Sequence, residues 1–251
     1  MKTSPKFHWL SLLTLLCGGI GILLRSWLYG TGLDSSNLLS STHPAGYLVL
    51  VLSLGTALAL FLFTRRCTAQ RKYSELFPAS VAGGAGTWAG AVGILLTAII
   101  ALVRKDGTAA ILTGFAGILA AAALVFVGLC RMKGRRPGYY FHTVVCVYFL
   151  LRLITSYKSW SSDPQLHDYC FQLLATVCIM LYCYHRAALD WRPGSPRAMV
   201  LLGLLGVYFC CLSLVRSDAP FLYAGTGVWM LTNLGSPAPP YRGTFVREAG
   251  C

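Results

Sequence analysis

Long apolar runs separated by short polar segments form the dominant pattern of this chain. Each of the first six runs is about as long as the ~20 helical residues that cross the ~30 Å hydrocarbon core of a bilayer. The last two are shorter, and only "RSDA" separates them, so they are either two tight spans or one span followed by a re-entrant segment. The pattern predicts an all-α, polytopic transmembrane helix bundle of about eight spans, with seven as the alternative. The runs cover 7–29, 44–64, 79–103, 108–130, 138–158, 164–189, 198–215 and 218–234.

Lysine and arginine are distributed unevenly between the two sides of such a bundle. With a cytoplasmic N-terminus and eight spans, 15 of the 21 Lys and Arg residues, among them Arg131 and Arg186, fall on the cytoplasmic side. With seven spans the C-terminal residues move outside, and the ratio weakens to 13 against 8. Because basic connections stay in the cytoplasm, the distribution predicts a cytoplasmic N-terminus and favours eight spans.

The connections between the runs are too short to fold on their own. The longest one on the cytoplasmic side is 64–78, so residues 1–234 are predicted to form a single transmembrane domain. Residues 235–251 are rich in Pro and Gly, which predicts a flexible cytoplasmic tail. The first run follows Lys2 and Lys6 as in a signal peptide, but no small-residue cleavage site ends it, so we expect a retained span.

Composition supports a membrane protein and argues against nucleic-acid binding. The chain is 56% hydrophobic and 12% charged, whereas soluble domains average about a quarter charged residues. The net charge of +13 comes from short clusters between the apolar runs, not from one domain or stripe that could track a nucleic acid. We therefore expect the basic segments to meet anionic lipid head groups.

Small residues are concentrated in the third and fourth runs. Gly86 and Gly90 form a GxxxG motif that Gly93 extends, and Gly114 and Gly117 repeat the pattern in the next run. Small residues let helix backbones approach closely, which drives association where lipid is as apolar as the side chains. These glycines are predicted to pack the two helices against each other, with a homodimer contact as the alternative.

The sixth run begins with an unusual number of polar residues. In "SWSSDPQLHDYCFQLLA", Asp163 is suited to accept the first free amide hydrogens and Pro164 to occupy the first helical position, so capping explains both. His167, Asp168 and Gln172 lie further in.

A carboxylate inside a bilayer needs a partner, and the preceding run offers one. Asp168 and Gln172 are four positions apart and therefore share a helix face. Arg152 lies ~7 Å deeper by helical rise, a gap that its long side chain can close. We predict a polar cluster of Arg152, Asp168, Gln172 and His167, with an Arg152–Asp168 pair. The cluster either locks the helix hairpin or lines a ligand pocket open to the outside.

Four runs end on the outer side with similar short sequences: "ILLRS", "ALVRK", "FLLRL" and "SLVRS". Their arginines are Arg25, Arg104, Arg152 and Arg216. They record either a duplicated hairpin, as in many transporters, or arginines that each extend toward the membrane surface. Spacings of 79, 48 and 64 residues are irregular and favour the second interpretation.

Residues that usually carry catalysis or bind metals form no recognisable motif. The ten cysteines include no Cys-x-x-Cys pair, and no Asp or Glu lies near the centre of a run. His142 and His185, near the inner ends of two neighbouring runs, could titrate or bind a metal, but two histidines without a carboxylate make a weak site. No cofactor or metal is predicted, and an intramembrane enzyme around these histidines or Cys178 is the weakest hypothesis.

Two short segments of the sequence resemble segments of a known protein family. "SWSSDPQLHDYCFQLLA" and "WMLTNL" are similar to a family of uncharacterised small multi-span membrane proteins of Gram-positive anaerobic bacteria, most clearly over residues 148–190. The resemblance implies a bacterial inner-membrane location and transfers no activity, cofactor or catalytic residue.

Two functions fit the predicted bundle. The first is a permease-like small-molecule carrier, which the buried polar cluster, the glycine-rich helices and the hairpin repetition favour. The alternative is a non-catalytic membrane sensor, scaffold or accessory subunit whose polar groups only hold the helices together, alone or as a homo-oligomer.

Overall fold

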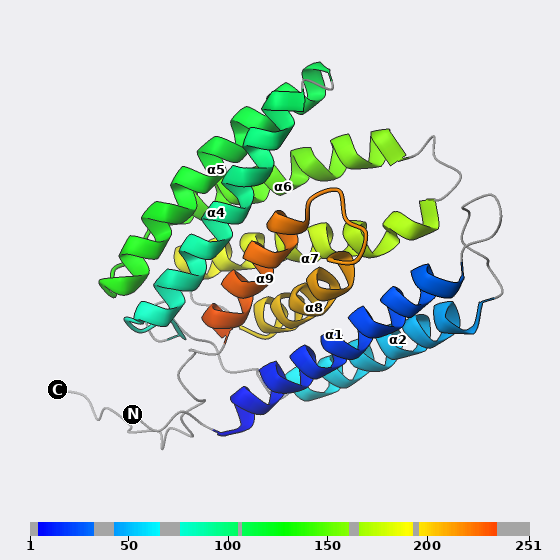
Figure 1. Cartoon of the computed structure of the whole chain (residues 1–251). Coiled ribbons are helices and arrows are strands. Elements are labelled where there is room, and N and C mark those ends of the chain that lie inside the picture. The colour runs from blue at the N-terminus through cyan, green and yellow to red at the C-terminus, as the bar shows by residue number, and fades with distance from the viewer. Residues whose placement is uncertain are drawn as a thin grey trace.

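The computed structural model describes residues 5–32, 43–65, 76–104, 107–160, 166–192 and 196–234, with only the backbone of 5–8, 159–160 and 166–168. Helices, with no strand, make up the regular structure of these segments, which confirms the predicted all-α class. Six of the helices are long and apolar enough to cross a membrane. In chain order (Figure 1) the helices are α1 Pro5–Thr31, α2 Pro44–Thr64, α4 Val81–Arg104, α5 Thr108–Met132, α6 Tyr139–Trp160, α7 Leu166–Trp191, α8 Arg197–Ser213 and α9 Pro220–Leu234.

The last two helices form an antiparallel pair. With 17 and 15 residues, α8 and α9 are ~25 and ~22 Å long. A Cβ atom on Gly203 would meet Leu234, and one on Gly206 would meet Met230, so α9 runs antiparallel to α8 and ends opposite Gly203. Both predicted segments are therefore helices, whereas their crossing of the membrane as two spans stays a prediction, because neither belongs to the six long apolar helices.

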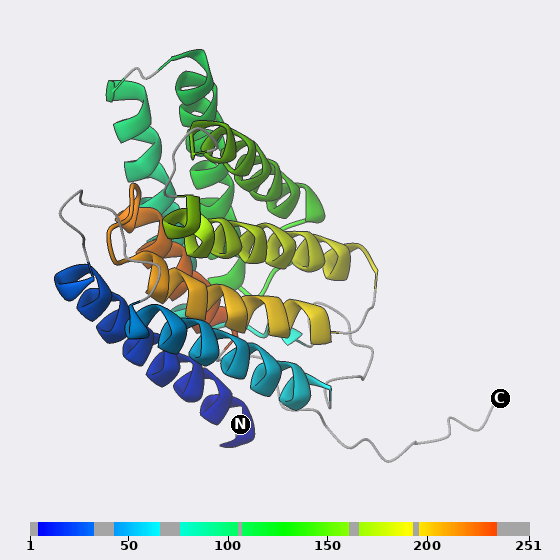
Figure 2. The same ribbon diagram turned by 90° about the vertical axis from the view of Figure 1, so that its right-hand side faces the viewer.

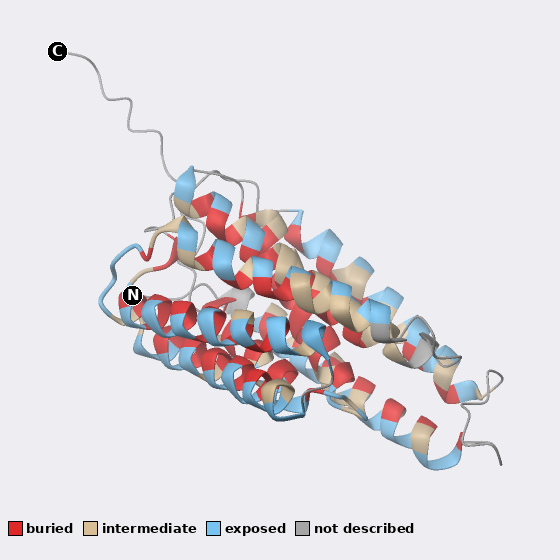
Figure 3. Ribbon diagram, turned by 90° about the horizontal axis from the view of Figure 1, so that it is seen from above, coloured by how far each residue is buried: buried red, intermediate tan, exposed pale blue. Residues whose placement is uncertain are grey.

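Helix α8 lies at the centre of the bundle. It packs against α1, α2, α7 and α9. Helix α4 packs against α9 and pairs with α5, and α6 packs between α5 and α7. Figures 1 and 2 show the α1–α2 hairpin on one side of this centre and the α4–α5 hairpin on the other. Figure 3 shows buried positions facing inward and exposed positions facing outward along most helices. Because the outward positions of a membrane bundle meet lipid, they are as apolar as the interior, as the exposed Leu54 and Leu58 of α2 illustrate.

Successive helices run in opposite directions, so some helices begin and the others finish at each end of the bundle. We call the end where α1, α4, α6 and α8 begin the N-terminal end; α2, α5, α7 and α9 finish there. The other end is called the opposite end. Which end faces the cytoplasm stays a prediction from the basic residues.

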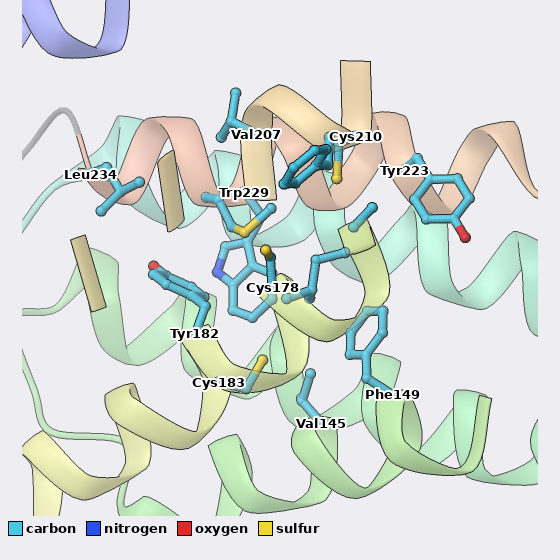
Figure 4. Close-up of a cluster of buried hydrophobic side chains, with 14 of the residues drawn as sticks. Val145, Phe149, Cys178, Tyr182, Cys183, Val207, Cys210, Tyr223, Trp229 and Leu234 are labelled. Carbon is cyan, nitrogen blue, oxygen red and sulfur yellow. The ribbon is translucent and has the colours of Figure 1, made fainter. Parts of the chain in front are cut away.

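The interior between α6, α7, α8 and α9 is mainly aromatic. Trp229 and Tyr182 are fully buried and meet edge to face, with ring centroids 5.6 Å apart. Figure 4 shows these two rings side by side, with Tyr223 toward the other end of α9. Cys178 and Cys210 are buried in the same region as free thiols, where sulfur acts as a small apolar group.

The GxxxG glycines of α4 have a different partner from the predicted one. A Cβ atom on Gly86 would collide with Thr232, and one on Gly90 would lie 2.9 Å from Trp229 Cβ. At Gly93 the neighbour is the backbone of Phe221 and Gly225. All of these neighbours belong to α9, so the GxxxG face of α4 packs closely against α9.

The α4–α5 contact uses another face of α4. There, Cβ atoms on Gly84 and Gly114 would meet Met132 and Leu102 across the pair. The sequence did not reveal the choice of partner because glycine-rich faces look alike until the helices are placed.

Candidate functional site

Five polar side chains meet between α6, α7 and α9 in the half of the bundle nearer the opposite end. We call this group the Gln172 cluster: Tyr148, Arg152, Gln172, Thr176 and Tyr223. In α6 and in α7 the contributing residues are four positions apart, a spacing that places both on one face of the helix. Three helices therefore contribute polar atoms to one region of an otherwise apolar core.

Hydrogen bonds connect most of the Gln172 cluster. The Thr176 hydroxyl donates to the backbone carbonyl of Gln172 over 2.8 Å and lies 3.4 Å from the hydroxyl of Tyr223. Tyr223 also donates to the Gln172 carbonyl, over 3.4 Å. On α6, the Arg152 guanidinium lies close enough to Tyr148, and across the helix interface to Tyr223, for its charge to act on both hydroxyl groups. The cluster is thus one electrostatically connected unit.

Two polar atoms of the cluster lack a partner in the described part of the chain. One is Oε1 of Gln172, whose side chain is 1% exposed, and the other is the buried Nε of Arg152. A buried polar group without a hydrogen bond costs about 1–3 kcal/mol, and native structures contain few of them. The cluster therefore presents one acceptor and one donor that a bound polar molecule can satisfy.

The turn between α8 and α9 borders the cluster with an unusual backbone. Arg216 has a φ of 57°, in the left-handed region that side-chain-bearing residues rarely occupy. Its carbonyl accepts a long hydrogen bond of 3.5 Å from Nε2 of Gln172. This contact ties the Gln172 amide to the turn, and the side-chain oxygen of Gln172 has no donor among the described residues.

The predicted cluster is described only in part. Arg152 and Gln172 both lie near Tyr223, which contacts Gln172 and interacts with the charge of Arg152. The side chains of His167 and Asp168, like residues Asp163 and Pro164, lie outside what the structure describes. The Arg152–Asp168 pair and the helix cap accordingly stay predictions.

Arg25 does not extend to the membrane surface, as the short sequence "ILLRS" around it had predicted. It is 2% exposed, and its guanidinium donates to the Leu212 carbonyl and to the Tyr29 hydroxyl, each over 2.7 Å. The guanidinium carbon lies 5.0 Å from the Phe171 ring centroid. The tyrosine four positions after the arginine was the signal in the sequence, since it places a hydroxyl on the same helix face. The expectation was wrong for Arg25, whereas Arg104 and Arg216 are exposed as predicted.

A second polar group, the Arg186 network, lies near the N-terminal end. Arg186 is fully buried and donates to the Tyr182 hydroxyl over 3.0 Å and to Oδ1 of Asn233 over 3.1 Å. Nδ2 of Asn233 in turn donates to the Gly83 carbonyl and to the Thr87 hydroxyl, both at 3.1 Å. The network connects α7, α9 and α4. It was not predicted, because Arg186 lies next to a basic connection and was assigned to the cytoplasmic side.

The segment before α4 closes the N-terminal end of the bundle beneath the Arg186 network. Phe77 is buried, and its ring centroid lies 4.4 Å from the guanidinium carbon of Arg186 and 5.1 Å from that of Arg131. Arg131 also donates to the Pro78 carbonyl. A ring between two guanidinium groups is a stabilising cation–π arrangement. Arg131, too, was counted as a cytoplasmic charge, and the structure buries it instead.

The two histidines near the N-terminal end have different surroundings. His142 is fully buried and close enough to Arg186 to interact with its charge. His185 is half-buried and packs edge-on against Tyr184, with ring centroids 5.4 Å apart. Among the described residues, no three His, Cys, Asp or Glu side chains are placed to hold a metal ion.

Comparison with known proteins adds no relative: no family profile, curated protein or solved structure matches this chain. The multi-pass helical architecture follows from the helices themselves. What the polar groups do has to be inferred from their contacts.

Proposed function

We propose that this membrane protein is a permease-like carrier of a small polar molecule, and that the Gln172 cluster is where the molecule binds. The observation that carries the proposal is the pair of buried atoms, Gln172 Oε1 and Arg152 Nε, without partners among the described residues. An acceptor and a donor in one connected cluster match a ligand that offers both a donor and an acceptor.

A purely structural lock fits this cluster less well. Residues that only hold helices together satisfy one another, because an unpaired polar atom in a dry interior weakens the fold. In the Gln172 cluster, the Arg152 charge acts on Tyr148 of its own helix, and Tyr223 bonds to a backbone atom of α7. Among the described residues, the side-chain amide of Gln172 has only the long contact to the α8–α9 turn.

The position of the cluster suits entry from the opposite end. Gln172 is the seventh residue of α7, so it lies ~9 Å along the helix from Leu166. If the basic connections are cytoplasmic, this end is outside the cell, and an external solute would approach the site from it. The family that the sequence resembles is the ground on which we propose the bacterial inner membrane.

The ligand-binding test compares two arginines. Purified protein in detergent is screened for thermal stabilisation by amino acids, sugars, nucleosides and polyamines. Arg152→Met is expected to weaken binding of a stabilising compound by about tenfold or more, since charge-assisted hydrogen bonds are worth about 1.5–3 kcal/mol. Arg104→Met removes the same charge from an exposed position and is expected to leave affinity unchanged. A compound that binds both variants as well as the wild type would count against the site.

The alternative is a non-catalytic sensor, scaffold or accessory subunit. The Arg186 network favours it, because that network shows that buried polar residues can hold helices of this chain together. Flux of the identified compound into proteoliposomes separates the two functions: a carrier moves it, whereas a sensor or scaffold only binds it.

A further inference from the structure

Helices α7 and α9 meet through long side chains, since their backbones make few close contacts. Tyr223 bonds to Gln172 in the half nearer the opposite end, and Asn233 bonds to Arg186 near the N-terminal end. Gln172 and Arg186 are 14 positions apart, so they lie on the same side of a helix with ~3.6 residues per turn. The two polar regions therefore lie along one interface, and the side chains between them decide whether a molecule can pass.

Trp229 is the largest fully buried side chain of the described residues, and it lies between these two regions. By helical rise it is ~9 Å along α9 from Tyr223 and ~6 Å from Asn233. Its ring meets that of Tyr182 on α7 edge to face, with the centroids 5.6 Å apart (Figure 4). The two rings bridge α7 and α9 and separate one polar region from the other.

The indole of Trp229 is held by packing. Its Nε1 is buried and has no hydrogen-bond partner among the described residues. Asn233, one turn further along α9, is tied by its amide to three residues of α4 and α7. Turning the indole aside therefore costs packing contacts but no hydrogen bond to a described residue. A buried donor of this kind also gains from an acceptor on a polar molecule that passes it.

We propose that Trp229 is the gate of the carrier: it closes the route from the Gln172 cluster to the N-terminal end and turns aside to let the bound molecule pass. The inference rests on the proposed carrier function, because a scaffold needs no gate. A carrier exposes its site to one side of the membrane at a time, so a barrier has to lie beyond the site. The Trp229–Tyr182 contact has this position, on the side of the cluster away from the opposite end.

Two free thiols of α7 report on the gate. By helical rise, Cys178 lies ~9 Å from Gln172, and Cys183 lies ~8 Å further toward the N-terminal end. Tyr182, which meets Trp229, comes between them in the chain. Iodoacetamide is a suitable probe, because it is small, carries an amide donor and acceptor, and alkylates thiols irreversibly. If it enters through the Gln172 cluster, it reaches Cys178 before the gate and Cys183 behind it.

The experiment treats the full chain in detergent with iodoacetamide and maps the alkylation of each thiol by peptide mass spectrometry. In the wild type, Cys178 is expected to react faster than Cys183. Trp229→Ala is expected to raise the rate at Cys183 relative to Cys178 about tenfold or more, since a permanent opening replaces a rare local one. Trp229→Phe keeps an aromatic barrier, so its ratio is expected to stay within about threefold of the wild type.

Leu60→Ala controls for a loosened fold. Leu60 is fully buried on α2, which packs against α1 and α8, so its loss leaves a cavity away from the α7–α9 interface. A comparable rise in Leu60→Ala and Trp229→Ala would overturn the gate, because both would reflect only a weaker core. An unchanged ratio in Trp229→Ala while Cys178 reacts would overturn the gate and leave the proposed site standing. Alkylation at neither thiol in any variant would overturn the carrier together with its gate.

Discussion

The Arg186 network and the Gln172 cluster use the same kinds of residue at opposite ends of one bundle, with different results. Asn233 uses both ends of its amide: Nδ2 donates to α4 and Oδ1 accepts from Arg186 on α7. Gln172 makes one long side-chain contact to a turn and leaves its oxygen without a partner among the described residues. A buried amide whose hydrogen-bonding groups are satisfied holds helices together, whereas one with an open acceptor is suited to bind a ligand.

The largest expected effect is at Asn233. Asn233→Leu removes hydrogen bonds to α4 and leaves the Gly83 carbonyl and one Arg186 nitrogen without that partner. We expect a loss of at least about 3 kcal/mol in unfolding free energy, since each buried unsatisfied group costs about 1–3 kcal/mol. Reversible unfolding in mixed micelles measures it.

Thr232→Val is the control for Asn233→Leu. Among the described residues, the Thr232 hydroxyl bonds only to carbonyls of its own helix, at Val228 and Trp229. A change below about 0.5 kcal/mol is therefore expected, because such bonds contribute little to helix stability. A comparable loss in both variants would show that the Arg186 network is not what holds α4, α7 and α9 together.

The next largest effect concerns the close packing of α9 against α4. Gly93→Ala places a methyl group against the backbone of Phe221 and Gly225, which cannot yield as a flexible side chain can. We expect a loss of about 1–3 kcal/mol from overpacking, again by unfolding in mixed micelles. Gly55→Ala, on α2 with nothing within 4 Å of its added methyl group, should instead be neutral or stabilise by up to about 1 kcal/mol. Similar results for both would contradict the placement of α9.

The smallest effect is the sharpest test of the comparison. Gln172→Met has a similar size and shape but no unsatisfied carbonyl, so ligand-free stability is expected to change by less than about 1 kcal/mol, in either direction. Thermal unfolding of the purified ligand-free variant measures it. A loss as large as that of Asn233→Leu would mean that Gln172 is structural and would remove the main support for a binding site.

The spans could be predicted from the sequence because apolar length alone decides whether a helix can cross a bilayer. All eight predicted ranges match helices within a few residues. Arg152 and Gln172 were also found, since a charged or amide group inside an apolar run is unusual. Tyr148, Thr176 and Tyr223 were not, because hydroxyl groups in membrane helices often bond to their own backbone and give no distinct signal.

Which residues face each other was decided only by the tertiary structure. In a soluble protein, the polar side of a helix shows which side is buried, but lipid is as apolar as a protein core, so the lipid-facing and inward-facing sides of these helices have similar composition. Asn233 and Gly83 are 150 positions apart, and Arg25 and Leu212 are 187 apart. The sequence by itself determined a multi-pass helical membrane protein with polar residues at known depths. Only the packing of the helices decided which polar residues satisfy one another and which keep an atom without a partner among the described residues.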